Sequence, residues 1–259
     1  MELPPSDNLF TTEPQLAPTM VFFDLDNTLF DHRQSLKCAL SAVRSVFPSL
    51  RKITSDDLAE KYNGALNHVY GKYLRNEIAH EDQDVEKIKL FFKSLDLKEP
   101  DSECIARFRS VYKTIYRTNR KATPGSIQTL RRLRDNGYRT AIITNGPSES
   151  QIEKAKAIGV FDLVECVITS EEAGHPKPDV KIFQYAMQKL SVNTKKVYMV
   201  GDSVKADVKG ALDAKVMPIL YSPSSNKSLE VFFGREISVI RHFDQLPMIL
   251  EPPSDFSWD

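Results

Sequence analysis

Two patterns of hydrophobic and polar positions divide the sequence. In residues 21–33 and from residue 120 onward, short apolar runs are separated by amphipathic segments of helix length. The apolar runs predict strands, which are Val21–Phe23, Thr140–Thr144, Leu163–Thr169, Lys196–Val200, Met217–Tyr221 and a weaker one at Ile237–Ile240. The segments between them predict helices, which are Ser126–Asn136, Ser148–Ile158, Pro178–Leu190 and Val204–Ala214. This alternation predicts an α/β fold in which helices cover both faces of a parallel sheet.

Residues 34–119 follow a different pattern. Glycine is scarce there, and apolar residues recur every three or four positions. The repeats predict four amphipathic helices, which are Ser35–Phe47, Ser55–Arg75, Asp82–Leu95 and Ser102–Tyr116. We therefore predict a core formed by residues 21–33 and 120–259, with a helical domain of residues 34–119 inserted into it.

The two ends of the chain carry prolines and show no sustained periodicity. Residues 1–20 contain four prolines and lack the apolar centre of a signal peptide, so we predict a disordered lead. The tail Glu251–Asp259 is expected to lie on the surface or to fray.

Composition and charge exclude several classes of function. Lys plus Arg and Asp plus Glu both number 35, so the zero net charge gives no reason to expect a nucleic acid polymer or a membrane as partner. No apolar stretch approaches the roughly 20 residues that cross a bilayer. Cys38, Cys104 and Cys166 form no C-x-x-C pair and are predicted to be buried thiols of a reducing compartment. We predict a cytoplasmic protein, either monomer or homodimer, whose partner is a small molecule.

Polar residues follow the predicted strands at the point where each strand ends. Asp24 and Asp26 follow the first strand, Thr144 and Asn145 lie at the end of the second, and Asp202 follows the fourth. Ligands of open parallel sheets bind at the carboxyl ends of the strands. We therefore expect these side chains to meet at one edge of the sheet.

The carboxylates at this edge predict a metal site. Asp24 and Asp26 are two positions apart, so in extended backbone they share a face and repel each other. A divalent cation relieves this repulsion, and Asp202 from a neighbouring strand adds a third carboxylate. A set of oxygen ligands alone suits Mg²⁺.

A magnesium site at a strand end is suited to phosphoryl transfer, which requires positioning and neutralisation of charge. Lys177, just before a predicted helix, supplies positive charge. The Thr144 hydroxyl and the backbone N–H groups around Asn145 and Gly146 can donate hydrogen bonds to phosphate oxygens. One carboxylate can act as nucleophile and a second as acid and base. Each motif alone has a plain structural explanation as a turn or a helix cap. Their common placement at strand ends favours chemistry.

The four motifs resemble those of the haloacid dehalogenase-like hydrolases. The matching strings are FFDLDNTLFD (Phe22–Asp31), IITNG (Ile142–Gly146), HPKPD (His175–Asp179) and VGDSVKAD (Val200–Asp207). The resemblance covers residues from about 21 to 221. It implies a Rossmann-like core with a helical cap inserted just after the first motif, at the place where the helical pattern occurs.

The resemblance also implies roles for individual residues. Asp24 would be the nucleophile and Asp26 the general acid and base. Asp202 would complete Mg²⁺ coordination together with Asp24 and the backbone carbonyl of Asp26. Asp207 and Ser203 would support the metal ligands or Lys177 without touching the substrate. These roles predict a Mg²⁺-dependent phosphomonoester hydrolase that forms an aspartyl-phosphate.

Other activities of the same fold stay open. Dehalogenases of this family lack the second acid of the first motif, so the presence of Asp26 disfavours dehalogenation. A phosphotransferase or mutase shares the motifs, and a regulatory binding module without turnover is a further alternative. The motif variants are most similar to a branch that contains nucleoside 5′-monophosphatases and acylneuraminate-9-phosphatases. A nucleoside 5′-monophosphate or a sugar phosphate is therefore a possible substrate.

The predicted cap offers candidate specificity residues. Arg75 is predicted to contact a substrate carboxylate or a second anionic group, and Tyr70 or Tyr73 could stack on a base. The plain alternative is that Tyr70 packs inward with its leucine neighbours. His32 and Arg33, just after the first motif, could face the site from the hinge.

Overall fold

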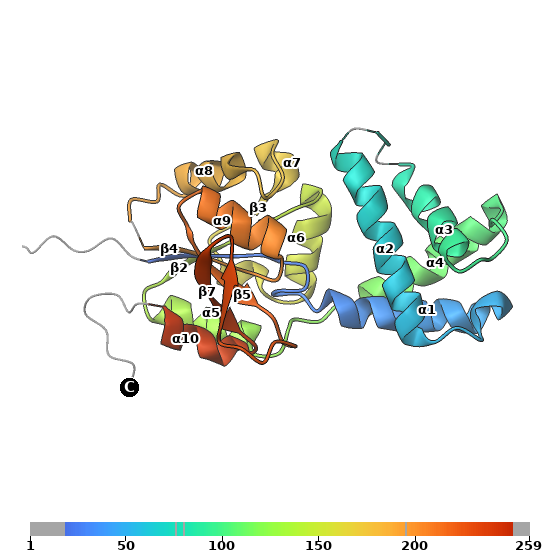
Figure 1. Cartoon of the computed structure of the whole chain (residues 1–259), viewed down its shortest axis with the longest axis horizontal. Helices are drawn as coiled ribbons and strands as arrows, with labels where there is room; N and C mark the ends of the chain where they lie inside the picture. The colour runs from blue at the N-terminus through green and yellow to red at the C-terminus, as the bar shows by residue number, and fades with distance from the viewer. Residues whose placement is uncertain (1–18, 76, 80, 195, 251–259) are drawn as a thin grey trace, which may run out of the picture.

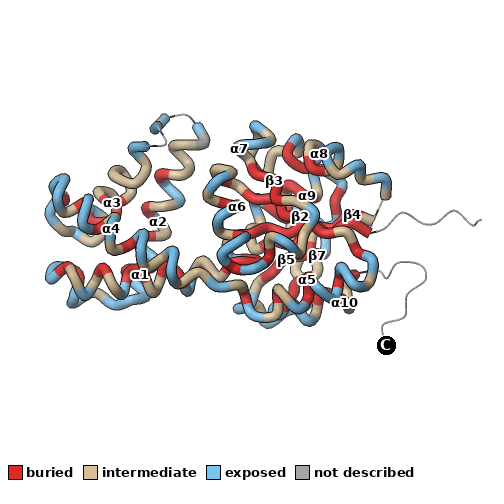
Figure 2. Tube along the Cα trace, turned by 180° about the vertical axis from the view of Figure 1, so that it is seen from behind, coloured by how far each residue is buried: buried red, intermediate tan, exposed pale blue. Residues whose placement is uncertain are grey.

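The protein has two parts, a sheet with helices around it and a separate group of four helices (Figure 1). The computed structural model describes residues 19–75, 77–79, 81–194 and 196–250. Buried residues follow the strands and the inner sides of the helices in both parts (Figure 2). None of the helices in the described part of the chain combines the length and the apolar character needed to cross a membrane.

The described residues form a seven-stranded sheet with β1 near its middle. Its strand order is β3-β2-β1-β4-β5-β7-β6, and all neighbours are parallel except the antiparallel β6–β7 pair. The strands are β1 (Met20–Phe23), β2 (Arg139–Thr144), β3 (Val167–Thr169), β4 (Val197–Gly201), β5 (Met217–Tyr221), β6 (Leu229–Phe232) and β7 (Arg235–Ile240). Because β2 and β4 flank β1 on opposite sides, the strand order reverses there. The end of β1 is therefore where an open sheet binds its ligand.

Strand β1 is buried on both faces, which explains its continuous apolar sequence. Val21 and Phe23 belong to one apolar cluster, and Met20 and Phe22 belong to another on the opposite face. The first cluster includes residues of α5 (Ser126–Asp135), α6 (Ser148–Ala157) and α10 (Leu246–Ile249). The second includes residues of α8 (Val180–Lys189) and α9 (Gly210–Asp213). The predicted α/β class is confirmed.

The four helices of the second part have an apolar core of their own. They are α1 (His32–Val46), α2 (Ser55–Leu74), α3 (Gln83–Ser94) and α4 (Ser102–Thr118). Phe91 and Phe108 are fully buried, and their ring centroids lie 5.8 Å apart. Tyr62 stacks against Tyr112 with a centroid distance of 4.8 Å. We refer to α1–α4 as the helical unit.

The chain enters and leaves the helical unit through two adjacent segments. Phe30 and Ala122 form an isolated antiparallel bridge, and the Asp31 N–H donates to the Lys121 carbonyl at 3.0 Å. Ser35 Oγ donates to the Asn119 carbonyl at 2.9 Å. The helical unit is thus joined to the sheet by two connecting segments that are hydrogen-bonded to each other.

Several predicted elements need correction. Only Val167–Thr169 of the predicted strand Leu163–Thr169 pairs in the sheet, because Phe161–Leu163 forms a 3-10 turn instead. The predicted helix Val204–Ala214 begins as a π-helical stretch, Val204–Lys209, and continues as α9. The four-residue helix α7 (Ser170–Ala173) was not expected.

The first strand of the C-terminal hairpin, β6, was also missed, whereas the second, β7, contains the predicted strand Ile237–Ile240. β6 is an edge strand on which Leu229 and Val231 are exposed, and Glu230 interrupts its apolar residues. Phe233 and Gly234 both have positive φ, 53° and 73°, in the connecting turn. This turn type favours Asn-Gly, and Phe-Gly does not give that signal.

The predictions for the chain ends and the thiols have mixed outcomes. The predicted lead ends at residue 20, but Met20 is already the buried first residue of β1. The rest of that prediction, residues 1–18, and the tail 251–259 lie outside the described residues. The three cysteines are free, as predicted, but each is only partly buried.

Candidate active site

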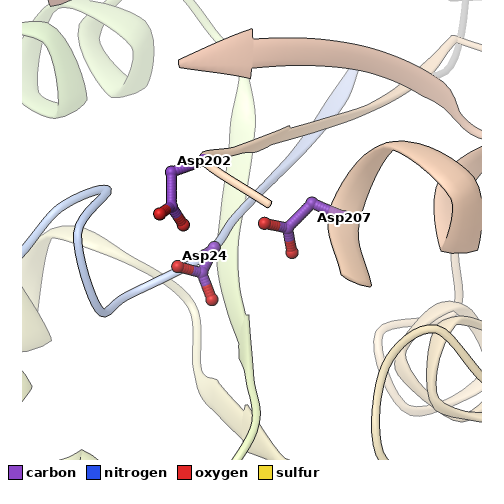
Figure 3. Close-up of side chains that lie close together, drawn as sticks. All are labelled: Asp24, Asp202 and Asp207. Atoms are coloured by element: carbon purple, nitrogen blue, oxygen red, sulfur yellow. The ribbon is translucent and has the colours of Figure 1, made fainter. Parts of the chain in front are cut away.

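The sheet brings the predicted acidic residues together. Phe23 pairs in register with Ile142 of β2 and Val200 of β4, so the residues that follow these three strands lie side by side. Figure 3 shows the carboxylates of Asp24, Asp202 and Asp207 converging. One oxygen of each lies within 4.8 Å of the others.

Lys177 is the buried cation of this cluster. Its Nζ donates to Asp24 Oδ1 at 2.7 Å, to Asp207 Oδ1 at 2.6 Å and to the Ile143 carbonyl at 2.7 Å. The residue is only 4% exposed, and all three ammonium protons are used. Burial lowers the pKa of Lys177, but Asp207 and Asp24 outweigh this effect and raise the pKa above its ordinary value.

A single lysine does not balance the three carboxylates. Burial and neighbouring charges raise the pKa of Asp24 to about 7 and the pKa of Asp202 to about 8. The two carboxyl groups therefore hold protons at pH values where an exposed aspartate is ionised. Such a cluster suits a divalent cation, because the cation would replace those protons and neutralise the excess charge.

Asp207 is fixed from behind by the start of the π-helical stretch. The Ser203 N–H donates to Asp207 Oδ2 at 3.0 Å, and Ser203 Oγ accepts from the Ala206 N–H at 3.0 Å. Gly201 is required here, because a Cβ on it would lie 2.2 Å from Asp207 Oδ2. Ser203 thus acts as a helix cap that also orients Asp207.

Asp26 has a separate environment, built by two residues that the sequence did not single out. Lys154 Nζ donates to both carboxylate oxygens at 2.7 and 2.8 Å, and Gln151 Nε2 donates to Oδ2 at 2.9 Å. Burial raises the pKa of Asp26, but Lys154, His32 and these hydrogen bonds prevail and lower it. Gln151 and Lys154 are three apart on α6, which begins just after the second motif. That spacing places both on one helix face and was the available signal.

Thr144 and Asn145 are held in different ways. Thr144 Oγ1 accepts from Gln151 Nε2 at 2.6 Å, which leaves the hydroxyl proton available to a ligand. The Asn145 side chain bridges the backbone of Lys177, accepting from its N–H at 2.7 Å and donating to its carbonyl at 2.9 Å. Asn145 therefore positions the lysine loop, and only its backbone is left for the predicted phosphate contact. The Gly146 N–H, another expected donor, is occupied by Ser170 Oγ at 2.9 Å.

A cavity of ≈ 960 Å³ lies between the helical unit and the strand ends. Asn63, Asn67, Tyr70 and Tyr73 of α2 line it opposite the predicted catalytic aspartates. His32 also lines it, as the sequence suggested. Its Nδ1 lies 2.6 Å from the hydroxyl of Tyr116 on α4, and burial lowers its pKa.

Two predicted arginines lie elsewhere. Arg75 is exposed at the end of α2, and its Nε and Nη2 pair with Glu77 at 2.5 and 3.1 Å. Arg33 is exposed on α1. Neither is among the described residues that line the cavity. The predicted substrate contact of Arg75 therefore has no support from this geometry.

Comparison with known proteins identifies the class. Residues 18–215 match the haloacid dehalogenase-like hydrolase family, and the chain belongs to that family. It is 27% identical over 233 residues to a glyceraldehyde 3-phosphate phosphatase of Methanothermobacter thermautotrophicus, covering 89% of this chain and 98% of the relative. It is also 27% identical to the pyrimidine 5′-nucleotidase YjjG of Escherichia coli, covering 75% of this chain and 81% of the relative.

A solved structure supports the same fold. The HAD-hydrolase YfnB of Bacillus subtilis, solved bound to magnesium, superposes with a TM-score of 0.70 at 19% identity. The comparison covers 90% of this chain and 99% of that one. The predicted family resemblance is confirmed.

Proposed function

We propose that this protein is a Mg²⁺-dependent phosphatase that hydrolyses a small phosphorylated metabolite through an aspartyl-phosphate on Asp24. The main observation behind this proposal is that two aspartates only two positions apart have different environments. Asp24 faces Lys177 and the acidic cluster, whereas Asp26 is held by Lys154 in its own environment. Two carboxyl groups with pKa values shifted in opposite directions are typical of a site that divides nucleophile and acid-base roles. The relatives named as phosphatases and nucleotidases support the substrate class.

The chemistry follows from these positions. An Asp24 oxygen attacks phosphorus, the bond to the ester oxygen breaks, and the departing alcohol takes a proton from Asp26. A bound phosphoryl group adds negative charge beside Asp26, which raises its pKa toward the range that a proton donor needs. Water then attacks phosphorus and gives its proton to Asp26, which releases phosphate and restores Asp24.

Mg²⁺ fits the acidic cluster as cofactor. The Asp24 and Asp202 carboxylates and the Asp26 backbone carbonyl would hold it, with Asp207 behind them. The bound cation would supply charge neutralisation for the phosphoryl oxygens. Thr144 would position the same oxygens with its hydroxyl. Lys177 would contribute positive charge beside them, because its three protons go to Asp24, Asp207 and the Ile143 carbonyl.

The helical unit is proposed to act as a cap over this site. Two observations support this proposal. The cavity is lined by residues of both parts. The two connecting segments pair at Phe30 and Ala122 and would form a narrow hinge. A cap of this kind excludes water and supplies contacts to the leaving group.

Mg²⁺ is expected to raise the melting temperature Tm more at about pH 8 than at about pH 5. Asp24 and Asp202 have folded pKa values of about 7 and about 8, both above the ordinary value of 3.8. The folded protein thus binds more protons than the unfolded chain, so its metal-free stability falls as pH rises toward those values. Differential scanning fluorimetry with and without Mg²⁺ measures the gain. An equal gain at both pH values, or an undiminished gain in Asp202→Asn, would contradict the proposed site.

Asp26→Asn is expected to reduce steady-state hydrolysis by about 10²- to 10⁴-fold, the range for a lost acid-base group. The loss in kcat/KM, which reports formation of the aspartyl-phosphate, should be larger for alkyl phosphates than for p-nitrophenyl phosphate, because p-nitrophenolate leaves without protonation. Stopped-flow assays with p-nitrophenyl phosphate should then show a burst of p-nitrophenol followed by slow turnover. Asp213→Asn, a surface change on α9, is the control. Equal losses for both ester types would argue against proton transfer by Asp26.

The activity itself is tested with wild-type protein, Mg²⁺ and a panel of phosphomonoesters. The panel contains p-nitrophenyl phosphate, glyceraldehyde 3-phosphate, nucleoside 5′-monophosphates, sugar phosphates and phosphoglycolate. We expect release of inorganic phosphate from at least one small ester. No hydrolysis of any ester across pH values and divalent metals would refute the proposal and favour a binding module.

A further inference from the structure

Tyr70 of α2 has a buried hydroxyl with an unused donor. Its side chain lines the cavity, and its Oη has no hydrogen bond of normal geometry among the described residues. A buried hydroxyl without a partner costs free energy, so such an atom at a site points to a missing ligand. Among the described residues of the helical unit that line the cavity, Tyr70 is the one whose buried hydroxyl has no hydrogen bond of normal geometry.

The surroundings of this hydroxyl belong to the core. Burial raises the pKa of Tyr70 to about 12, so the group remains protonated and able to donate. The Ser170 side chain and the charge of Lys177 act in the opposite direction and lower that pKa, whereas the charge of Asp26 raises it. Asp26 lies in the loop after β1, and Ser170 and Lys177 lie in the segment that follows β3. The Tyr70 hydroxyl is thus directed from α2 toward the strand ends.

The core residues at the strand ends offer few free hydrogen-bond donors to a phosphoryl group. Ser170 Oγ accepts a hydrogen bond from the Gly146 N–H, and the three protons of the Lys177 ammonium go to two carboxylates and a carbonyl. A phosphoryl group attacked by Asp24 has several anionic oxygens to satisfy. A neutral hydroxyl on α2 would supply a further hydrogen bond from the helical unit's wall of the cavity.

We propose that Tyr70 is a substrate-contacting residue, whose hydroxyl donates a hydrogen bond to a phosphoryl oxygen and completes the site from the helical unit. The inference rests on the proposed phosphatase function and deepens it. It replaces the expectation that Tyr70 stacks on a base, because its polar atom and not only its ring is directed to the strand ends. Since the contact is to the phosphoryl group, it applies to every phosphomonoester that the enzyme accepts.

The test is Tyr70→Phe, which removes one oxygen and keeps the ring. Titration calorimetry with inorganic phosphate and Mg²⁺ should show binding about 10- to 100-fold weaker than wild type, the range for a lost hydrogen bond to a charged group. kcat/KM should fall by a similar factor for all esters. The ligand-free variant should melt at the same temperature or about 2 to 4 °C higher, because an orphaned donor has been removed. Tyr185→Phe, which loses a surface hydroxyl bonded to Glu172, is the matched control.

The outcomes separate this inference from the proposed function. Phosphate affinity equal to wild type in Tyr70→Phe would overturn the inference while leaving the phosphatase proposal intact. A lower Tm with unchanged phosphate affinity would also overturn it, since the hydroxyl would then serve packing. A wild type that neither binds phosphate nor hydrolyses esters would instead refute the proposed function, and the inference with it.

Discussion

Lys177→Met is expected to abolish phosphatase activity and to lower the free energy of unfolding by about 3–5 kcal/mol, the cost of leaving buried charges without a partner. Lys177 Nζ contacts Asp24 at 2.7 Å and Asp207 at 2.6 Å, and the lysine is 4% exposed. Methionine fills a similar volume but supplies neither charge nor donors. Urea unfolding and a steady-state phosphatase assay measure the two effects.

A second variant separates charge from packing. Lys177→Met combined with Asp207→Asn removes one of the carboxylates that the lysine neutralises, so it should recover part of the stability but none of the activity. Lys181→Met, an exposed lysine on α8, is the control for loss of a lysine. Wild-type stability in Lys177→Met would show that the buried ion pairs are not what holds this cluster together.

Asp24→Asn is expected to reduce hydrolysis by about 10⁴-fold or more, because it removes the nucleophile. The same change should stabilise the metal-free protein above about pH 7, since it removes a carboxylate whose pKa is raised to about 7 in the folded state. Activity and stability thus move in opposite directions. Phosphate-release assays and thermal melts at about pH 8 measure both.

Asp24→Glu provides the matched control for charge. It keeps the carboxylate but places its oxygens one methylene farther from the backbone, so it should also fail to turn over. Hydrolysis by Asp24→Asn at a rate close to wild type would remove Asp24 from the nucleophile role. Loss of both activity and stability in Asp24→Asn would instead indicate a structural role.

The sequence could predict the centre of this site because the geometry of a parallel sheet is regular. Val21–Phe23 is apolar because β1 is buried on both faces, and that run places Asp24 at its end. Asp202 could be located by the same argument. Register then brings the two together, as the pairing of β1 with β4 shows. These positions depend on local patterns that a sequence displays.

The rest depends on side-chain directions that a sequence does not display. Gln151 and Lys154 are polar residues on a helix, a pattern usual for a solvent-exposed face, yet both are directed to Asp26. Arg75 lies at the end of α2, where it pairs with Glu77 and is not among the described residues that line the cavity. Tyr70 has the spacing of an inward-packing residue, and only the fold shows that its hydroxyl has no hydrogen bond of normal geometry to the described residues.

The most direct test of the account is chemical trapping of the acyl-phosphate. Wild-type protein is mixed with Mg²⁺ and an accepted phosphomonoester, quenched during turnover, reduced with borohydride and digested for mass spectrometry. Borohydride converts an aspartyl-phosphate to homoserine, and we predict homoserine at position 24 in wild type and none in Asp24→Asn. Continued hydrolysis by wild type with no modification at position 24, or modification at Asp26 instead, would contradict the account.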